Sequence, residues 1–139
     1  MKITDLKPTI VWKFFHQVTQ VPRPSKKEGK MIEFLESFAK EYKIAIKKDE
    51  AGNLLMSKPA TPGMEDRPVV VLQSHMDMVC EKNNGTKHDF DNDPIETIVD
   101  GEWLRANGTT LGADNGIGVA AELALLASDD IQHGPIECL

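Results

Sequence analysis

The run Val69-Val-Val-Leu72 constrains the fold of this chain more than any other segment. Its residues are apolar without interruption and mostly β-branched, which is typical of a strand that is buried on both faces of a sheet. We therefore predict a central strand here, in an α/β fold with a mixed sheet flanked by helices. The residues that follow, Gln73-Ser-His-Met-Asp77, then lie at the carboxyl end of the strand, where open α/β sheets bind their ligands.

Two amphipathic helices are predicted before this strand. The first follows Pro8 and carries apolar residues at helical spacing over 10–18. The second runs to about Tyr42, and Ser25 with Glu28 three residues later forms a capping-box pattern at its start. These two helices can cover the sheet.

Shorter patterns predict the other elements. Alternating residues on both sides of Glu50-Ala-Gly-Asn53 predict one β-hairpin. Asp100-Gly101 between apolar residues predicts a second, in which we expect Trp103 to be part of the core. The polar residues 79–93 predict a long loop between the two hairpins, of the kind that builds sites near a sheet edge.

The last part of the chain is predicted to return to the sheet. The residues 119–127 are rich in Ala and Leu and predict a helix. The segment that begins near Ile136 has the pattern of another core strand, and the sequence stops inside it without a turn. We therefore expect residues 1–139 to be the N-terminal portion of a larger domain.

Composition limits the partners that this chain can have. Sixteen basic and twenty-two acidic residues give a formal net charge of -6, and no basic stripe interleaved with aromatic residues is present, so we expect no nucleic-acid partner. No apolar stretch approaches the roughly 18 residues of a membrane span, and the first residues lack the apolar region of a signal peptide. The two cysteines, Cys80 and Cys138, are too few for a disulfide framework. These features predict a cytoplasmic protein without a membrane partner.

His75 and Asp77 are the first candidate site residues. They are two positions apart at the predicted strand end, so both side chains point to the same side. A zinc-bound imidazole usually donates its other ring N–H to a carboxylate, which fixes the tautomer and raises the basicity of the ligand. The pattern therefore favours His75 as a metal ligand oriented by Asp77. A hydrogen-bonded histidine without a metal is the alternative that this pair alone leaves open.

Asp114 is the second candidate, because it lies in a glycine-rich loop before the last predicted helix. Its neighbours include Gly108, Gly112, Gly116 and Gly118. Glycines allow positive φ and close approach of the backbone, so a carboxylate in such a loop can be held against two cations. The rival interpretation is a phosphate cradle. The loop, however, has no Lys after its glycines and lacks the Gly-x-Gly-x-x-Gly order of dinucleotide sites.

Four motifs together resemble the aminoacyl-histidine dipeptidases, a branch of the co-catalytic zinc peptidases. They are Pro22-Arg-Pro-Ser25, Asp49-Glu-Ala-Gly-Asn53, Gln73-Ser-His-Met-Asp-Met-Val79 and Gly108-Thr-Thr-Leu-Gly-Ala-Asp-Asn-Gly-Ile-Gly118. Their order and spacing agree with the family over nearly the whole chain, and the last motif is long and specific. The resemblance implies that residues 1–139 are the N-terminal portion of a metallopeptidase catalytic domain.

The resemblance also implies the chemistry. His75 would bind one of two Zn²⁺ ions, Asp77 would orient His75 as a catalytic residue, and Asp114 would bridge the two metals; Co²⁺ or Mn²⁺ could replace zinc. A pair of cations about 3.5–4 Å apart polarises a scissile carbonyl and lowers the pKa of a bridging water toward about 7. The implied substrates are dipeptides, chiefly Xaa-His, and the implied complete enzyme can be a homodimer. A cis peptide bond between Asp114 and Asn115 is implied as well.

The other site residues of the family are not in this chain. The family has a Glu-Glu pair, general base and ligand, shortly after the strand near Ile136, and further ligands later. Glu137 precedes that position, and we interpret it as structural. Because zinc normally takes at least three protein ligands, His75 and Asp114 alone predict weak metal binding and no activity. Two alternatives remain: a deacylase or aminopeptidase on the same scaffold, and a non-catalytic module that binds a partner through an exposed sheet edge.

Overall fold

The computed structural model describes all of residues 1–139. The elements in chain order are the 3-10 helix η1 (Ile3–Asp5), α1 (Thr9–Thr19), α2 (Gly29–Tyr42), β1 (Ala45–Lys48), β2 (Leu54–Lys58), β3 (Val70–Leu72), β4 (Thr97–Asp100), β5 (Trp103–Ala106), α3 (Ala113–Ala127) and β6 (Ile136–Cys138). None of the helices combines the length and the apolar character that crossing a membrane requires.

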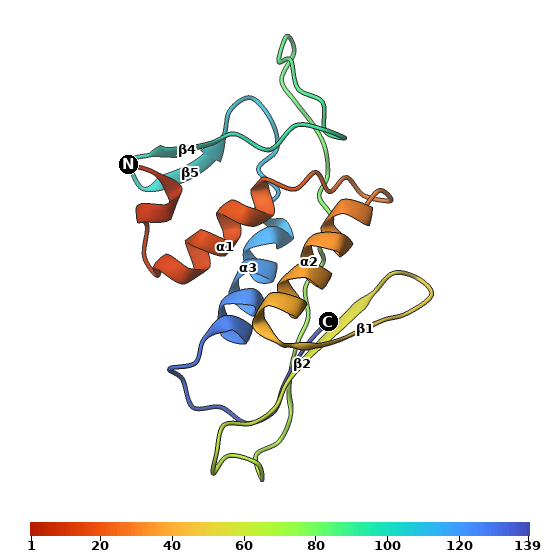
Figure 1. Cartoon of the computed structure of the whole chain (residues 1–139). Helices are drawn as coiled ribbons and strands as arrows, with labels where there is room; N and C mark the ends of the chain where they lie inside the picture. The colour runs from red at the N-terminus through yellow and green to blue at the C-terminus, as the bar shows by residue number, and fades with distance from the viewer.

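The sheet is mixed, which confirms the predicted α/β fold. Its four strands have the order β1-β2-β6-β3, and β3 pairs with β6 in parallel while the other two pairs are antiparallel. The strands β4 and β5 form a separate two-stranded hairpin. The helices α1, α2 and α3 lie together, with β1 and β2 near one end of this group and the β4-β5 hairpin near the other (Figure 1). Both predicted hairpins and the last predicted strand are therefore present.

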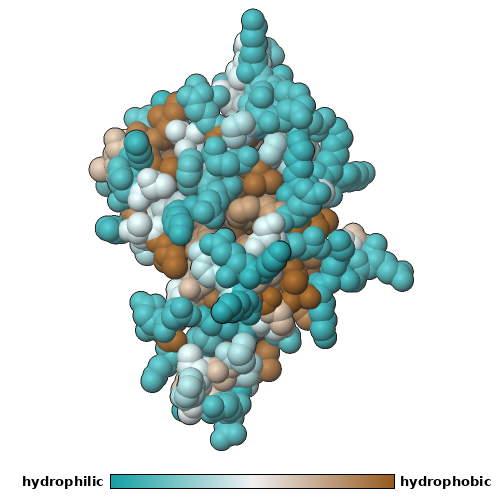
Figure 2. Space-filling model, viewed as in Figure 1, coloured by the Kyte–Doolittle hydropathy of each residue, from teal (hydrophilic) through white to brown (hydrophobic).

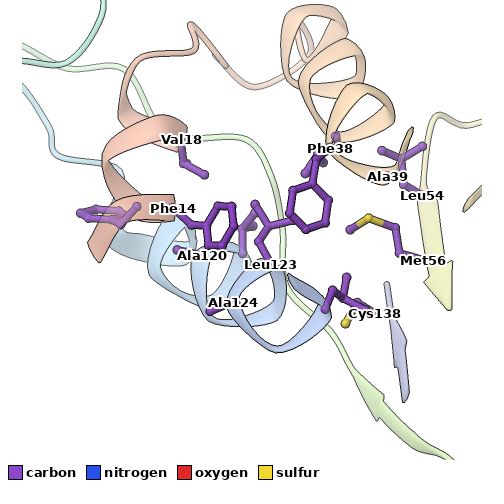
Figure 3. Packing of buried hydrophobic residues seen from close by; sticks show 14 of the residues in the cluster. Phe14, Val18, Phe38, Ala39, Leu54, Met56, Ala120, Leu123, Ala124 and Cys138 are labelled. Atoms are coloured by element: carbon purple, nitrogen blue, oxygen red, sulfur yellow. The ribbon is translucent and has the colours of Figure 1, made fainter. Parts of the chain in front are cut away.

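A single apolar core joins the three helices to the sheet. Figure 3 shows Phe14 from α1, Phe38 from α2 and Leu123 from α3 pointing toward one another, while Met56 and Cys138 come from the sheet. The rings of Phe14 and Phe38 meet edge to face with their centroids 5.5 Å apart, a favourable arrangement for aromatic pairs. Hydrophilic residues form most of the molecular face in Figure 2, and hydrophobic residues show between them in patches. The core thus holds α3, and the loop before it, against the sheet.

The prediction that the valine run is a central, doubly buried strand is wrong for this structure. β3 lies at the edge of the four-stranded sheet and pairs only with β6. Val69, Val70 and Val71 are 52%, 51% and 57% exposed. A central strand needs a second neighbour and a cover on each face, and the elements of residues 1–139 supply only one neighbour. The apolar pattern indicates what this strand would bury, not which elements bury it.

Three local predictions are also corrected. Helix α2 begins at Gly29 with Glu28 as its N-cap residue and without a side-chain cap, because the hydroxyl of Ser25 donates to Asp77 instead. Trp103, expected in the core, is 76% exposed, because the two-stranded β4-β5 hairpin has no element over the face that carries it. Helix α3 begins at Ala113, six residues before the predicted start, and has non-helical φ/ψ angles at Asp114 and Asn115.

Candidate metal site

The three predicted site residues meet in space. His75 and Asp77 lie in the segment that follows β3, and Asp114 lies in the first turn of α3. The two imidazole nitrogens of His75 face different carboxylates: Nδ1 is 2.9 Å from Oδ1 of Asp77, and Nε2 is 3.0 Å from Oδ1 of Asp114. The imidazole therefore bridges two carboxylates that are 37 residues apart in the sequence (114 minus 77).

Asp77 is held by a second contact on its other oxygen. The Ser25 hydroxyl donates a hydrogen bond to Oδ2 of Asp77, and this bond lowers the pKa of the Asp77 carboxyl, with a further contribution from His75. Asp77 is thus an anion at neutral pH. A fixed carboxylate on Nδ1 favours the tautomer with the proton on that nitrogen, which leaves Nε2 free to bind an electrophile. The structure thus contains the predicted contact between His75 and Asp77, and the role of Asp77 in orienting a metal ligand stays a prediction.

Asp114 presents its carboxylate to solvent. Its side chain is 96% exposed, and the contact with Nε2 of His75 is its only ion pair. The peptide bond between Asp114 and Asn115 is cis, as the family resemblance implied. The amide oxygen of Asn115 accepts a hydrogen bond from the backbone N–H of Gly118, 3.2 Å away, which fixes the turn behind Asp114. The loop therefore aims an accessible carboxylate at the ring of His75.

The protonation of His75 reflects this arrangement. Partial burial lowers the pKa of His75, but the hydrogen bonds to Asp114 and Asp77 outweigh burial, so the pKa lies above its usual value. Without a metal, the site is therefore suited to an imidazolium between two carboxylates. A divalent cation on the Nε2 side would take the place of that proton, because metal ligands bind in their deprotonated form.

Arg23 is the residue near this site that sequence analysis missed. It lies between two prolines in the motif Pro22-Arg-Pro-Ser25 and is 1% exposed. Its guanidinium reaches the segment that carries Asp77 and the loop that carries Asp114. The only sequence signal was its place within a family motif, and arginine is otherwise a surface residue in most proteins.

A cavity of about 390 Å³ opens beside His75. Its wall includes His75 and Asp77, but not Asp114, together with Ser74 and Glu122. Glu122 comes from α3, is 7% exposed and accepts a hydrogen bond of 3.0 Å from the hydroxyl of Ser74. Burial raises the pKa of Glu122, and the bond from Ser74 offsets this only in part. The carboxyl of Glu122 therefore costs stability when it is ionised.

Replacing Glu122 by glutamine should stabilise the protein, and the gain should grow with pH. Because the pKa of Glu122 is higher in the folded than in the unfolded protein, the protonated carboxyl contributes to the free energy of unfolding. This contribution is complete below the unfolded pKa of about 4.3 and is lost as pH rises through the pKa of the folded protein. The amide keeps an oxygen for the hydroxyl of Ser74 and has no charge to bury. Thermal unfolding of both proteins from pH 4 to 8 measures the difference. An equal difference at all pH values would contradict this account of Glu122.

The donor atoms fit a divalent metal ion as part of its ligand set. An imidazole nitrogen and a carboxylate oxygen 3.0 Å apart can both lie about 2.0–2.2 Å from one Zn²⁺ ion. The imidazole also has the carboxylate partner that zinc-binding histidines usually have. No group of three or more possible ligands occurs in the chain. His75 and Asp114 therefore offer two donor atoms, whereas a zinc site normally takes at least three protein ligands.

Two dipeptidases are similar to this chain in sequence, and one of them has a solved structure. The scan against family models found no match. A cytosol non-specific dipeptidase of Escherichia coli is 49% identical over 138 residues, which are 99% of this chain and 28% of that protein. The crystal structure of an aminoacylhistidine dipeptidase from Vibrio alginolyticus superposes with a TM-score of 0.97 at 50% identity, again over 99% of this chain and 28% of that chain. The resemblance to the aminoacyl-histidine dipeptidases is confirmed.

More distant structures share the fold alone. A tripeptidase from Staphylococcus aureus superposes with a TM-score of 0.72 at 23% identity and covers 93% of this chain. An aminopeptidase from Bacillus cereus gives the same TM-score at 22% identity. The chain spans 28% of the length of each of the two dipeptidases that it matches at 49% and 50% identity. The comparison therefore concerns only that part of each dipeptidase.

Proposed function

We propose that this chain forms part of a metal-dependent dipeptidase that cleaves Xaa-His dipeptides through a metal-activated water. The observation that carries the proposal is the ring of His75 held between Asp77 and the exposed carboxylate of Asp114, with contacts of 2.9 and 3.0 Å. Sequence identity of 49–50% to two proteins named as dipeptidases supports the reaction, and the name of the Vibrio alginolyticus protein supports the substrate class.

The contacts support a separate part for each residue in this proposal. His75 and Asp114 would bind metal. Asp77 accepts a hydrogen bond from Nδ1 of His75 and so orients the ring, and the hydroxyl of Ser25 holds Asp77 in place. Two Zn²⁺ ions held there, or Co²⁺ or Mn²⁺ in their place, would make a hydroxide available at neutral pH and polarise the scissile carbonyl. The exposed Asp114 is open on its second oxygen, which suits a carboxylate that bridges two cations. Residues 1–139 alone are inactive in this proposal, because they supply two ligands and no general base.

The relatives and the composition support a proposal for the location and the partners of the protein. The Escherichia coli protein is named as a cytosolic enzyme, and we place this protein in the cytoplasm with small peptides as its partners. The complete protein is proposed to be a homodimer that binds neither nucleic acid nor membranes. The net charge of -6 gives no attraction to phosphate backbones.

An assay of the complete gene product tests the proposal. We expect hydrolysis of Xaa-His dipeptides, loss of that activity after treatment with a chelator, and recovery with Zn²⁺, Co²⁺ or Mn²⁺. Faster cleavage of N-acyl amino acids or of longer peptides would favour a deacylase or aminopeptidase on the same scaffold. Activity that persists in excess chelator would contradict the metal-dependent mechanism.

The exposed edge of β3 favours one alternative of another class, a module that binds a partner strand. Val69, Val70 and Val71 are all more than half exposed, and an uncovered apolar edge strand can pair with another chain. This alternative predicts that residues 1–139 self-associate. A monomer at high concentration in gel filtration would count against it.

A further inference from the structure

Arg23 makes three hydrogen bonds, all to backbone carbonyls. Its Nη1 atom donates to the carbonyls of Met76 and Asp77, at 3.4 and 3.3 Å, and its Nη2 atom donates to the carbonyl of Gly112 at 2.8 Å. Met76 and Asp77 belong to the segment of His75, and Gly112 lies two residues before Asp114. One side chain therefore bonds to both halves of the candidate site.

Backbone hydrogen bonds complement the contacts of the guanidinium. The backbone N–H of Met78 donates to the carbonyl of Arg23 at 3.0 Å, and that of Ser25 donates to the carbonyl of Met78 at 3.3 Å. These bonds fix the segment of Arg23 along the segment of Asp77. The loop of Gly112 is joined to the chain after Asp77 through Thr110, whose backbone N–H donates to the carbonyl of Glu81 at 2.8 Å and whose hydroxyl donates to the carbonyl of Val79 at 2.7 Å. With the segment of Arg23 itself the loop has no backbone hydrogen bond, and the guanidinium makes that contact next to His75 and Asp114.

The charge of Arg23 is buried without a carboxylate in contact. Burial lowers the pKa of Arg23 to about 10, so the guanidinium remains charged at neutral pH. A buried cation is costly unless its donors are satisfied. Here backbone carbonyls accept from Nη1 and Nη2, while the buried Nε has no hydrogen-bond partner. A planar fork of donors can reach carbonyls on two sides at once, which the single ammonium group of lysine cannot do in the same geometry.

Two glycines of the Asp114 loop are explained by this guanidinium. A Cβ atom on Gly112 would lie 2.5 Å from Nη2 of Arg23, and one on Gly116 would lie 2.8 Å from the same atom. Gly112 also has a φ of +69°, which glycine adopts without strain. The loop therefore packs directly on Arg23, and any other residue at these positions would displace the side chain or the loop.

We propose that Arg23 is a positioning residue that sets the separation between His75 and Asp114 by bonding the carbonyls of Met76 and Asp77 on one side and of Gly112 on the other. The inference rests on the proposed function for its meaning in catalysis. The effect of Arg23 on the separation of His75 and Asp114 does not depend on that function. Arg23 itself touches neither the imidazole nor the carboxylates.

The first test compares Arg23→Lys with two controls in the complete gene product. Cobalt binding, followed by the visible absorption of Co²⁺, should weaken about 10–100-fold in Arg23→Lys, with an altered spectrum, because supporting groups of metal ligands have effects of this size. Phe38→Leu removes core packing away from the site and should lower the unfolding temperature without changing cobalt binding. Arg105→Lys alters an exposed arginine and should change neither the unfolding temperature nor cobalt binding. Equal cobalt affinity in Arg23→Lys and the unaltered protein, or an equal loss in Phe38→Leu, would overturn the proposal.

The second test does not depend on metal or activity. A crystal structure of the metal-free Arg23→Lys protein should show Nε2 of His75 and Oδ1 of Asp114 beyond hydrogen-bonding distance, compared with 3.0 Å here. Retention of that contact would overturn the proposal. If the unaltered protein neither binds cobalt nor cleaves dipeptides, the proposed function fails. The crystal structure of the Arg23→Lys protein still decides the role of Arg23 in that case.

A third variant tests the packing between the loop and the guanidinium. Gly116→Ala places a methyl group against Nη2 of Arg23 and should separate His75 from Asp114 as Arg23→Lys does. Because both changes act on one contact, the double variant should weaken cobalt binding by no more than the larger single effect. Additive losses would show that Gly116 acts on the site independently of Arg23 and would contradict the proposed linkage.

Discussion

Asp114→Asn should lower the hydrolysis of Xaa-His dipeptides by the complete gene product about 10³-fold or more, with no change in unfolding temperature. A carboxylate that bridges two cations carries charge that an amide lacks, and metal ions contribute several kcal/mol to the stabilisation of the transition state. The fold should tolerate the change because the side chain of Asp114 is 96% exposed and contacts only His75. Steady-state kinetics and metal content of the purified protein measure both effects.

Asp130→Asn is the matched control for this variant. Asp130 is another exposed aspartate, in the loop between α3 and β6, and its replacement by asparagine removes the same charge. It should retain full activity and full metal content. If Asp114→Asn keeps its metal and loses less than tenfold in activity, Asp114 is not a bridging ligand and the proposed site is wrong.

The His75–Asp77 pair was predictable because its geometry is local. Two residues of separation place both side chains on one side, and the structure shows the expected contact of 2.9 Å, although β3 ends at Leu72 and the pair lies just beyond it. The position of Asp114 is different. The glycine-rich loop indicated Asp114 as a candidate, but its approach to His75 depends on how α3 packs against the sheet. That contact was therefore predicted only through the family resemblance.

Arg23 and the edge position of β3 could not be predicted because they depend on distant neighbours. Nothing near Arg23 in the sequence indicates that its donors meet the carbonyl of Gly112, 89 positions away. The apolar run of β3 indicates a capacity for burial, and the actual exposure depends on which elements lie beside it. The capping-box pattern failed for a related reason: the hydroxyl of Ser25 has a stronger partner in Asp77, across a long-range contact.

Phe14→Ala should destabilise the domain by about 3–5 kcal/mol, because it leaves a large cavity in the core. Phe14 is 1% exposed, and its ring meets those of Phe38 and Tyr42 with centroids 5.5 and 6.0 Å away. Those contacts join α1 to α2, and Figure 3 shows Phe14 facing α3 as well. Unfolding of the complete gene product in urea, followed by fluorescence and circular dichroism, measures the change.

Trp103→Ala is the control that separates burial from apolar character. The sequence placed Trp103 in the core, and tryptophan has the larger side chain, so sequence pattern alone predicts the larger loss for this variant. The structure leaves Trp103 76% exposed on the β4-β5 hairpin, and surface changes of this kind are usually within about 0.5 kcal/mol. A loss near zero for Trp103→Ala beside a large loss for Phe14→Ala would place the core where the three helices meet the four-stranded sheet. Comparable losses would mean that the hairpin packs against a part of the protein outside residues 1–139, and that Trp103 is buried there.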